Sequence, residues 1–103
     1  MIPMNIILIG YRGTGKSSVG KIVAAELGMP VCSTDEEIVR AVGCSIPAFV
    51  EAHGWDAFRD VETGVVRSVV QQNNIVIDAG GGVVVRPANV AALKAAGRVF
   101  WLK

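Results

Sequence analysis

The chain has 103 residues, a formal net charge of +1 and a hydrophobic fraction of 51%. A chain of this length forms one domain at most, and it has neither a basic block nor the basic and aromatic interleaving of nucleic-acid binders. No apolar run approaches the roughly 18 residues of a membrane-spanning helix, and the chain does not start with the basic segment of a signal peptide. We therefore expect a cytoplasmic protein without a nucleic-acid or membrane partner.

A buried strand, a glycine-rich loop and a helix are predicted at the start of the chain. Residues 5–9 form an apolar, β-branched run, which is typical of a strand covered on both faces. Residues 10–17 then read GxxxxGKS, and apolar residues at helical spacing from Ser18 to Leu27 predict a helix that Gly28 ends. This is the context of a phosphate-binding loop, whose backbone N–H groups converge on phosphate oxygens at the positive end of the helix.

The loop residues have predicted roles in binding ATP and Mg²⁺. Lys16 is placed to reach the β- and γ-phosphates, and the Ser17 hydroxyl is placed to bind the metal. The remaining residues of the predicted ATP site are Gly13, Thr14, Gly15 and Ser18. A glycine-rich turn without a ligand is the alternative, but all four fixed positions and both flanks match the nucleotide-binding pattern.

The rest of the chain alternates short apolar runs with segments of helical period. The further predicted strands are Met29–Cys32, Ile75–Asp78 and Arg98–Leu102. The further predicted helices are Glu36–Val42, Ser45–Ala52, Trp55–Gln72 and Pro87–Ala96. Such alternation predicts an α/β fold, with a parallel sheet, the strand before the loop in its interior, and helices on both faces.

On the longest predicted helix, apolar residues recur at helical spacing and should cover one face. They are Trp55, Phe58, Val61, Val65, Val66, Val69 and Val70. Arg59, Glu62 and Arg67 lie off this stripe.

Three further groups could carry chemistry, because the carboxyl ends of parallel strands open on one edge of the sheet. Asp35 follows the second strand and could hold a substrate hydroxyl. Arg59 could hold a carboxylate in a two-pronged contact. Two simpler interpretations stay open: Asp35 could cap a helix starting at Glu36, and Arg59 with Glu62 could be a solvated helix pair. The third group is the run of glycines 80–82 after the third strand, and no tight turn evidently requires three glycines there.

Together these residues resemble the shikimate kinases. The likeness consists of GxxxxGKS at residues 10–17, Thr34-Asp35, Phe58-Arg59 followed by Glu62, and Gly80-Gly81-Gly82. It covers essentially the whole chain in the family's order. The resemblance implies a P-loop nucleoside-triphosphate-binding fold. It also implies transfer of the γ-phosphoryl group of ATP to the 3-hydroxyl of shikimate, in the pathway to aromatic amino acids.

The resemblance also assigns roles by position. It implies that Asp35, Arg59 and Gly81 contact shikimate. Asp35 would orient the attacking hydroxyl and accept its proton, and Arg59 would hold the carboxylate. Lys16 and Mg²⁺ would neutralise charge that develops on the phosphoryl oxygens, with Ser17 as the metal ligand. Lys16 and Asp35 are the expected catalytic residues.

The sequence departs from the family's pattern at two positions near the expected metal. An acidic residue is usual two positions before the substrate-binding aspartate, and this chain has Ser33 there. The strand before the glycines usually ends in a small residue, and here it ends in Asp78. The support of Mg²⁺ could therefore have moved from position 33 to Asp78.

The family's pattern also continues beyond the fourth strand, into a lid with a catalytic arginine, another substrate-binding arginine and a fifth strand. We interpret residues 1–103 as a single incomplete P-loop kinase domain, apparently truncated after the fourth strand and monomeric when complete. Expressed alone, these residues are expected to be poorly soluble, to bind ATP weakly and not to phosphorylate shikimate.

Three alternatives stay open. Another P-loop small-molecule kinase, such as a gluconate kinase, is disfavoured by the arrangement of Arg59, Glu62 and the three glycines. Residues 78–81 match the DxxG of GTP-binding switch proteins, although Asp35 and Gly82 have no role there. Finally, the chain could be a non-catalytic nucleotide-binding fragment.

Overall fold

A computed structural model describes residues 5–10 and 16–102 of the chain, and the loop residues 11–15 lie outside this description. The strands are β1 (Asn5–Gly10), β2 (Val31–Ser33), β3 (Val76–Ala79) and β4 (Gly97–Leu102). The helices are α1 (Lys16–Leu27), α2 (Thr34–Val42), α3 (Ile46–His53), α4 (Trp55–Val69) and α5 (Pro87–Ala96), with a short 3₁₀ helix η1 (Gly81–Val85). Every predicted strand and helix is present, with bounds within three residues of the prediction, and only η1 was not predicted.

The four strands form one parallel sheet in the order β2-β3-β1-β4. This confirms the predicted parallel sheet and the interior position of the strand that precedes the loop. Because all four strands run in the same direction, the segments that follow β1, β2 and β3 leave from the same edge. The end of β1 at Gly10, the start of α2 and the start of η1 therefore lie at this edge.

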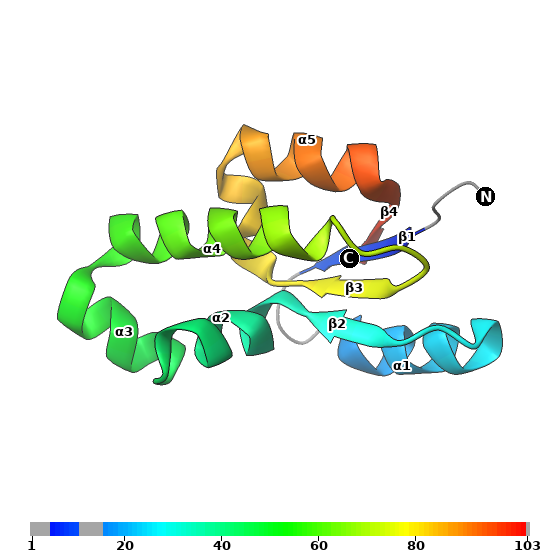
Figure 1. The fold of residues 1–103 in the computed structure, drawn as a ribbon, viewed down its shortest axis with the longest axis horizontal. Coiled ribbons are helices and arrows are strands. Elements are labelled where there is room, and N and C mark those ends of the chain that lie inside the picture. Colours follow the sequence, from blue (N-terminus) through cyan, green and yellow to red (C-terminus); the bar gives the residue numbers. More distant parts are fainter. Residues whose placement is uncertain (1–4, 11–15, 103) are drawn as a thin grey trace.

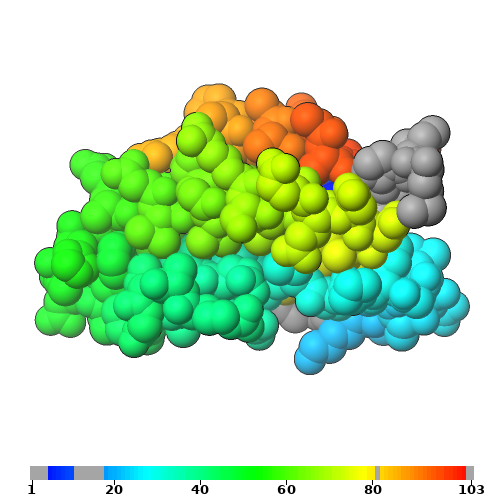
Figure 2. All heavy atoms as spheres, viewed as in Figure 1, coloured from blue at the N-terminus to red at the C-terminus, as the bar shows by residue number. Residues whose placement is uncertain are grey.

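Helices cover both faces of the sheet, as predicted (Figure 1). Alternate residues of the interior strands point to opposite faces. Ile7 and Ile77 pack in the core cluster that α4 and α5 complete, and Leu8 and Val76 pack against α1 on the other face. From the side shown in Figure 2, hardly any of β1 is visible. None of the helices in the described part of the chain is long and apolar enough to cross a membrane.

The buried face of α4 differs from the predicted stripe at two residues. Phe58, Val66 and Val69 are buried as predicted, but Trp55 at the start of the helix is 58% exposed. Glu62 is 1% exposed, so the prediction that it lies off the stripe is wrong. It is four residues from both Phe58 and Val66 and therefore shares their face.

Ser33 caps α2, and the interpretation of Asp35 as the cap is wrong. The Ser33 side chain accepts a hydrogen bond from the Glu36 backbone N–H at 3.3 Å, and the helix starts at Thr34. Asp35 lies inside the first turn, where a negative charge is favourable beside the helix N-terminus. At the other end, Gly43 adopts the left-handed conformation with φ of 77°, which ends the helix as predicted.

A buried asparagine ties the start of β1 to the segment before β3. The Asn5 side chain donates to the Gln72 carbonyl at 2.9 Å and accepts from the Ile75 N–H at 3.1 Å. Both ends of its amide are thus paired, although the residue is only 1% exposed. These bonds fix where the two strands meet.

The β4 edge predicts self-association of a polypeptide that consists of residues 1–103 alone. Within the described residues β4 pairs only with β1, and its Phe100 and Trp101 side chains are about half exposed. An open apolar edge favours pairing with another copy. Trp101→Lys is expected to raise the concentration at which association begins by about 5- to 30-fold in analytical ultracentrifugation. Ile22→Lys, which removes an exposed side chain on α1, is the control, and an equal shift for both variants would contradict the role of the edge.

Candidate active site

The predicted site groups that fall within the described residues lie at the carboxyl edge of the sheet. The phosphate-binding loop follows β1, Asp35 follows β2 on the first turn of α2, and the glycines follow β3. Lys16 is the first residue of α1, and the Ser18 side chain is exposed on the same turn. Gly13, Thr14 and Gly15, as well as the side chains of Lys16 and Ser17, fall outside the described part, so their roles remain predictions.

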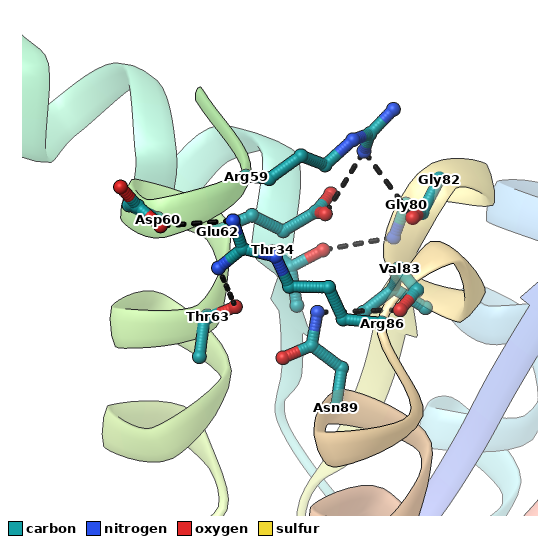
Figure 3. A network of polar contacts seen from close by, with 10 residues as sticks. All are labelled: Thr34, Arg59, Asp60, Glu62, Thr63, Gly80, Gly82, Val83, Arg86 and Asn89. Atoms are coloured by element: carbon teal, nitrogen blue, oxygen red, sulfur yellow. Dashed lines mark hydrogen bonds and ion pairs between the residues drawn. The ribbon is translucent and has the colours of Figure 1, made fainter. Parts of the chain in front are cut away.

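The Arg59 side chain is fixed between α4 and the glycine turn. Its Nη1 donates to Glu62 Oε1 at 2.9 Å and to the Gly82 carbonyl at 3.2 Å (Figure 3). Its guanidinium carbon also lies 5.3 Å from the centre of the Trp55 ring and 5.2 Å from that of Phe58, within the range of cation–π contacts. With a side chain only 18% exposed, Arg59 is not part of a solvated helix pair.

Glu62 is the buried anion that holds Arg59. Burial raises the pKa of the Glu62 carboxyl, although the hydrogen bond and the charge of Arg59 act to lower it. The charge of Asp35 raises the same pKa further, so the two carboxylates are close enough to interact. Asp35, Glu62 and Arg59 therefore form one electrostatic unit across α2 and α4.

Two of the three glycines are explained by the side chains beside them. A Cβ atom at Gly80 would collide with the Asp35 carboxylate, and one at Gly82 would collide with the Arg59 guanidinium. The Gly80 N–H also donates to the buried Thr34 hydroxyl at 2.8 Å, which ties the turn to the start of α2. The glycines thus let an anion and a cation approach the same short turn.

This turn sets the spacing between the two charged groups. Gly80 and Gly82 are two residues apart, so their Cα atoms lie within about 7 Å of each other. Asp35 is exposed, and it lies beside an open surface depression that Glu36, Val39 and Arg40 of α2 also line. The arrangement suits a small acid that offers a hydroxyl to Asp35 and a carboxylate to Arg59.

Asp78 is the acidic residue that is expected to support the metal. It is 8% exposed and pairs in register with Leu8 of β1 and Ser33 of β2. Because Leu8 and Val76 face α1, strand alternation places Asp78 on that same side of the sheet, toward the carboxyl edge. A carboxylate here fits a magnesium ion or its waters, since hard cations prefer oxygen ligands.

Arg86 makes contacts with α4, close to Glu62, that sequence reasoning missed. It lies between η1 and α5 and contacts Asp60 and Thr63 of α4, which are more than 20 residues away in the chain. Arginines at such distances from their partners leave no local signal in the sequence. The buried role of Glu62 could have been inferred from its spacing to Phe58 and Val66 on the same helix face.

The fold and the GxxxxGKS sequence define a P-loop α/β protein. A family model described as shikimate kinase matches residues 12–103. A shikimate kinase of Caldicellulosiruptor bescii is 41% identical over 98 residues, which are 95% of this chain and 57% of that protein. A solved shikimate kinase from Acinetobacter baumannii, in complex with shikimate, is 36% identical with a TM-score of 0.93, over 99% of this chain and 56% of that one. The chain belongs to the shikimate kinase family.

These matches also show how much of each relative's length the chain covers. It covers somewhat more than half the length of both of these relatives. A gluconokinase from Sinorhizobium meliloti is 19% identical with a TM-score of 0.56, over 96% of this chain and 55% of that one, and this likeness shows the fold alone.

Proposed function

We propose that the protein to which these residues belong is a shikimate kinase, which transfers the γ-phosphoryl group of ATP to the 3-hydroxyl of shikimate. The observation that carries this proposal is the glycine turn, where Asp35 approaches Gly80 and Arg59 approaches Gly82 so closely that a Cβ atom at either glycine would force the charged group to move. We further propose that residues 1–103 form one incomplete P-loop kinase domain of a monomeric, cytoplasmic enzyme.

In this proposal each residue contributes one part of the phosphoryl transfer. The Arg59 guanidinium holds the carboxylate of shikimate, and the buried Glu62 carboxylate keeps that guanidinium in place. Asp35 accepts a hydrogen bond from the 3-hydroxyl and takes up its proton as the oxygen attacks the γ-phosphorus. Gly81 contacts the same substrate through its backbone. Lys16 and the backbone N–H groups of residues 13–18 bind the phosphates of ATP.

Magnesium is the metal that this proposal implies, and it supplies positive charge to the phosphoryl oxygens when bound. Ser17 would be the protein ligand. Asp78 would hold a water of the metal from the neighbouring strand, in place of an acidic residue at position 33. This division is consistent with the role of Ser33 as the cap of α2, which its side chain performs in the structure.

Asp78→Ala is therefore expected to raise the Mg²⁺ concentration needed for half-maximal activity by about 10- to 100-fold, the usual cost of losing an outer-shell partner. Ser33→Asp in that background should partly restore it, because aspartate caps a helix about as well as serine and returns a carboxylate to the adjacent strand. Binding of Mn²⁺ in the presence of ATP, followed by electron paramagnetic resonance, gives a readout that does not depend on turnover. An unchanged metal titration in Asp78→Ala would refute this role.

The experiment that tests the function measures ADP release by the whole protein with shikimate, gluconate or neither as acceptor. Shikimate-dependent release of ADP from ATP is the expected result. Release with gluconate alone would favour another small-molecule kinase. A preference for GTP without an acceptor would favour a switch protein, and nucleotide binding without turnover would favour a binding module.

A further inference from the structure

Two arginines connect α4 and the segment after β3 in opposite directions (Figure 3). Arg59 extends from α4 to the Gly82 carbonyl at the start of η1. Arg86, which directly follows η1, extends back to α4. Its Nη2 lies 2.8 Å from Asp60 Oδ1, and its Nη1 donates to Thr63 Oγ1 at 3.3 Å. The short helix η1 is thus attached to α4 near both of its ends.

The residues that Arg86 contacts flank Glu62, the anion that holds Arg59. Asp60 and Thr63 lie on either side of Glu62 in the sequence of α4, and Figure 3 shows the Glu62 carboxylate between the two arginines. The charge of Arg86 lowers the pKa of Glu62, as does that of Arg59, so Arg86 also favours the ionised form that binds Arg59.

The position of η1 must be well defined for Arg59 to stay in place. The guanidinium lies so close to Gly82 that a Cβ atom there would force it to move, so a small shift of η1 toward α4 would displace Arg59 and a shift away would break its 3.2 Å bond. The Asn89 side chain supports the middle of the turn by donating to the Val83 carbonyl at 3.2 Å. Beyond Val83, the Arg86 side chain ties this segment to α4.

We propose that Arg86 is a positioning residue for substrate binding: it holds η1 against α4 and thereby fixes the place of the Arg59 guanidinium that receives the substrate carboxylate. The role of the carboxylate rests on the proposed function, whereas the attachment of η1 does not. Arg86 itself does not touch the substrate in this proposal.

The Arg86–Asp60 ion pair itself should contribute little to the stability of the fold. The Asp60 side chain is 74% exposed and that of Arg86 is 35% exposed. Pairs at such exposed sites contribute little to the stability of a fold. Loss of Arg86 should therefore change the affinity for the acid much more than it changes unfolding.

The test compares Arg86→Ala and Arg86→Lys with Arg67→Ala, which removes an exposed arginine near the other end of α4. In the whole protein, Arg86→Ala is expected to raise the Kd for shikimate about tenfold and to leave that for ATP within about twofold, the scale of coupling between contacting residues. Lysine keeps the charge without the two-pronged geometry, so Arg86→Lys should fall between. Arg67→Ala should change neither Kd, and its midpoint of thermal unfolding should match that of Arg86→Ala within a few degrees.

A double-mutant cycle shows whether Arg86 acts through Arg59. In the Arg59→Ala background, Arg86→Ala should cause almost no further loss of shikimate affinity. Fully additive losses, or equal losses for shikimate and ATP, would overturn the proposal.

Amide hydrogen exchange separates this proposal from the proposed function. The Val83 N–H bonds to the Gly80 carbonyl at 3.0 Å within the turn, and Arg86→Ala should accelerate its exchange even if the protein binds no shikimate. If the protein does not bind shikimate but the Val83 amide exchanges faster in Arg86→Ala, the proposed function is refuted and the attachment of η1 is supported. Unchanged exchange at Val83 would refute the attachment whatever the substrate.

Discussion

Arg59→Ala is expected to weaken shikimate binding by about 2–4 kcal/mol, which corresponds to about a 30- to 1,000-fold rise in Kd. The variant removes the charged donor from the turn, and it also leaves the buried Glu62 carboxylate without its partner. Binding of ATP should change by less than about twofold, because the predicted phosphate site is formed by the loop after β1. Calorimetric titration with each ligand measures both constants.

Two further variants distinguish lost recognition from lost folding. Arg59→Lys keeps a positive charge but not the planar fork, so an intermediate Kd is expected. Replacing both partners, with Arg59→Met and Glu62→Leu, should preserve the fold because apolar side chains often substitute well for a buried ion pair. This double variant should still bind ATP and fail to bind shikimate. Equal losses for both ligands in Arg59→Ala would contradict the assignment.

Glu62→Ala is expected to lower the free energy of unfolding by about 3 kcal/mol at neutral pH. Removing one member of a buried pair typically costs about 3–5 kcal/mol. The lower end applies because Arg59 is partly exposed and keeps its contacts with the Gly82 carbonyl and the Trp55 ring. Urea denaturation followed by circular dichroism gives the value. Glu51→Ala on the exposed side of α3 is the control and should have little effect.

Glu62 also predicts how stability depends on pH. Burial raises the pKa of this carboxyl in the folded protein above its ordinary value of 4.5. The unfolded chain therefore releases this proton at a lower pH than the folded protein does. The part of the stability that comes from this raised pKa is full below the ordinary pKa and is lost as the pH rises through the raised one, whereas the contact with Arg59 remains. Between these two pKa values, the free energy of unfolding of the wild-type protein should fall relative to that of Glu62→Gln. If the two plots of unfolding free energy against pH run parallel, the pKa of Glu62 is not raised.

The fold could be predicted from the sequence because its signals are local. Apolar runs bounded by glycine, proline or polar residues mark all four strands. Because helices connect these strands, right-handed crossovers between parallel strands are the expected arrangement. The end of α2 at Gly43 and the start of α5 at Pro87 follow from backbone preferences of single residues.

The sequence predicted which residues belong to the candidate site, but not which contacts these residues make with one another. A charged residue in an apolar stripe is normally assigned to the surface, since burying a charge is costly without a partner. Glu62 departs from this rule because the chain brings the guanidinium of Arg59 against it. The reason for Gly80 and Gly82 lies in side chains 45 and 23 residues earlier, which no local pattern contains.

The sequence also left open which residue caps α2. Serine, threonine and aspartate all occur at residues 33–35, and each is a suitable cap. The structure selects Ser33, which leaves Asp35 directed at the glycine turn. The predicted roles of residues 13–17 in nucleotide binding stay predictions.

The interior position of β1 has a consequence for synthesis on the ribosome. β1 is complete at Gly10, but its neighbours β3 and β4 begin only at Val76 and Gly97. At about 5–20 residues per second, roughly 3 to 13 s pass between the translation of Gly10 and that of Val76. The partners of the Asn5 amide, Gln72 and Ile75, are delayed by a similar time. An interior strand with five of its six residues buried is therefore the one that the nascent chain must carry unpaired for longest.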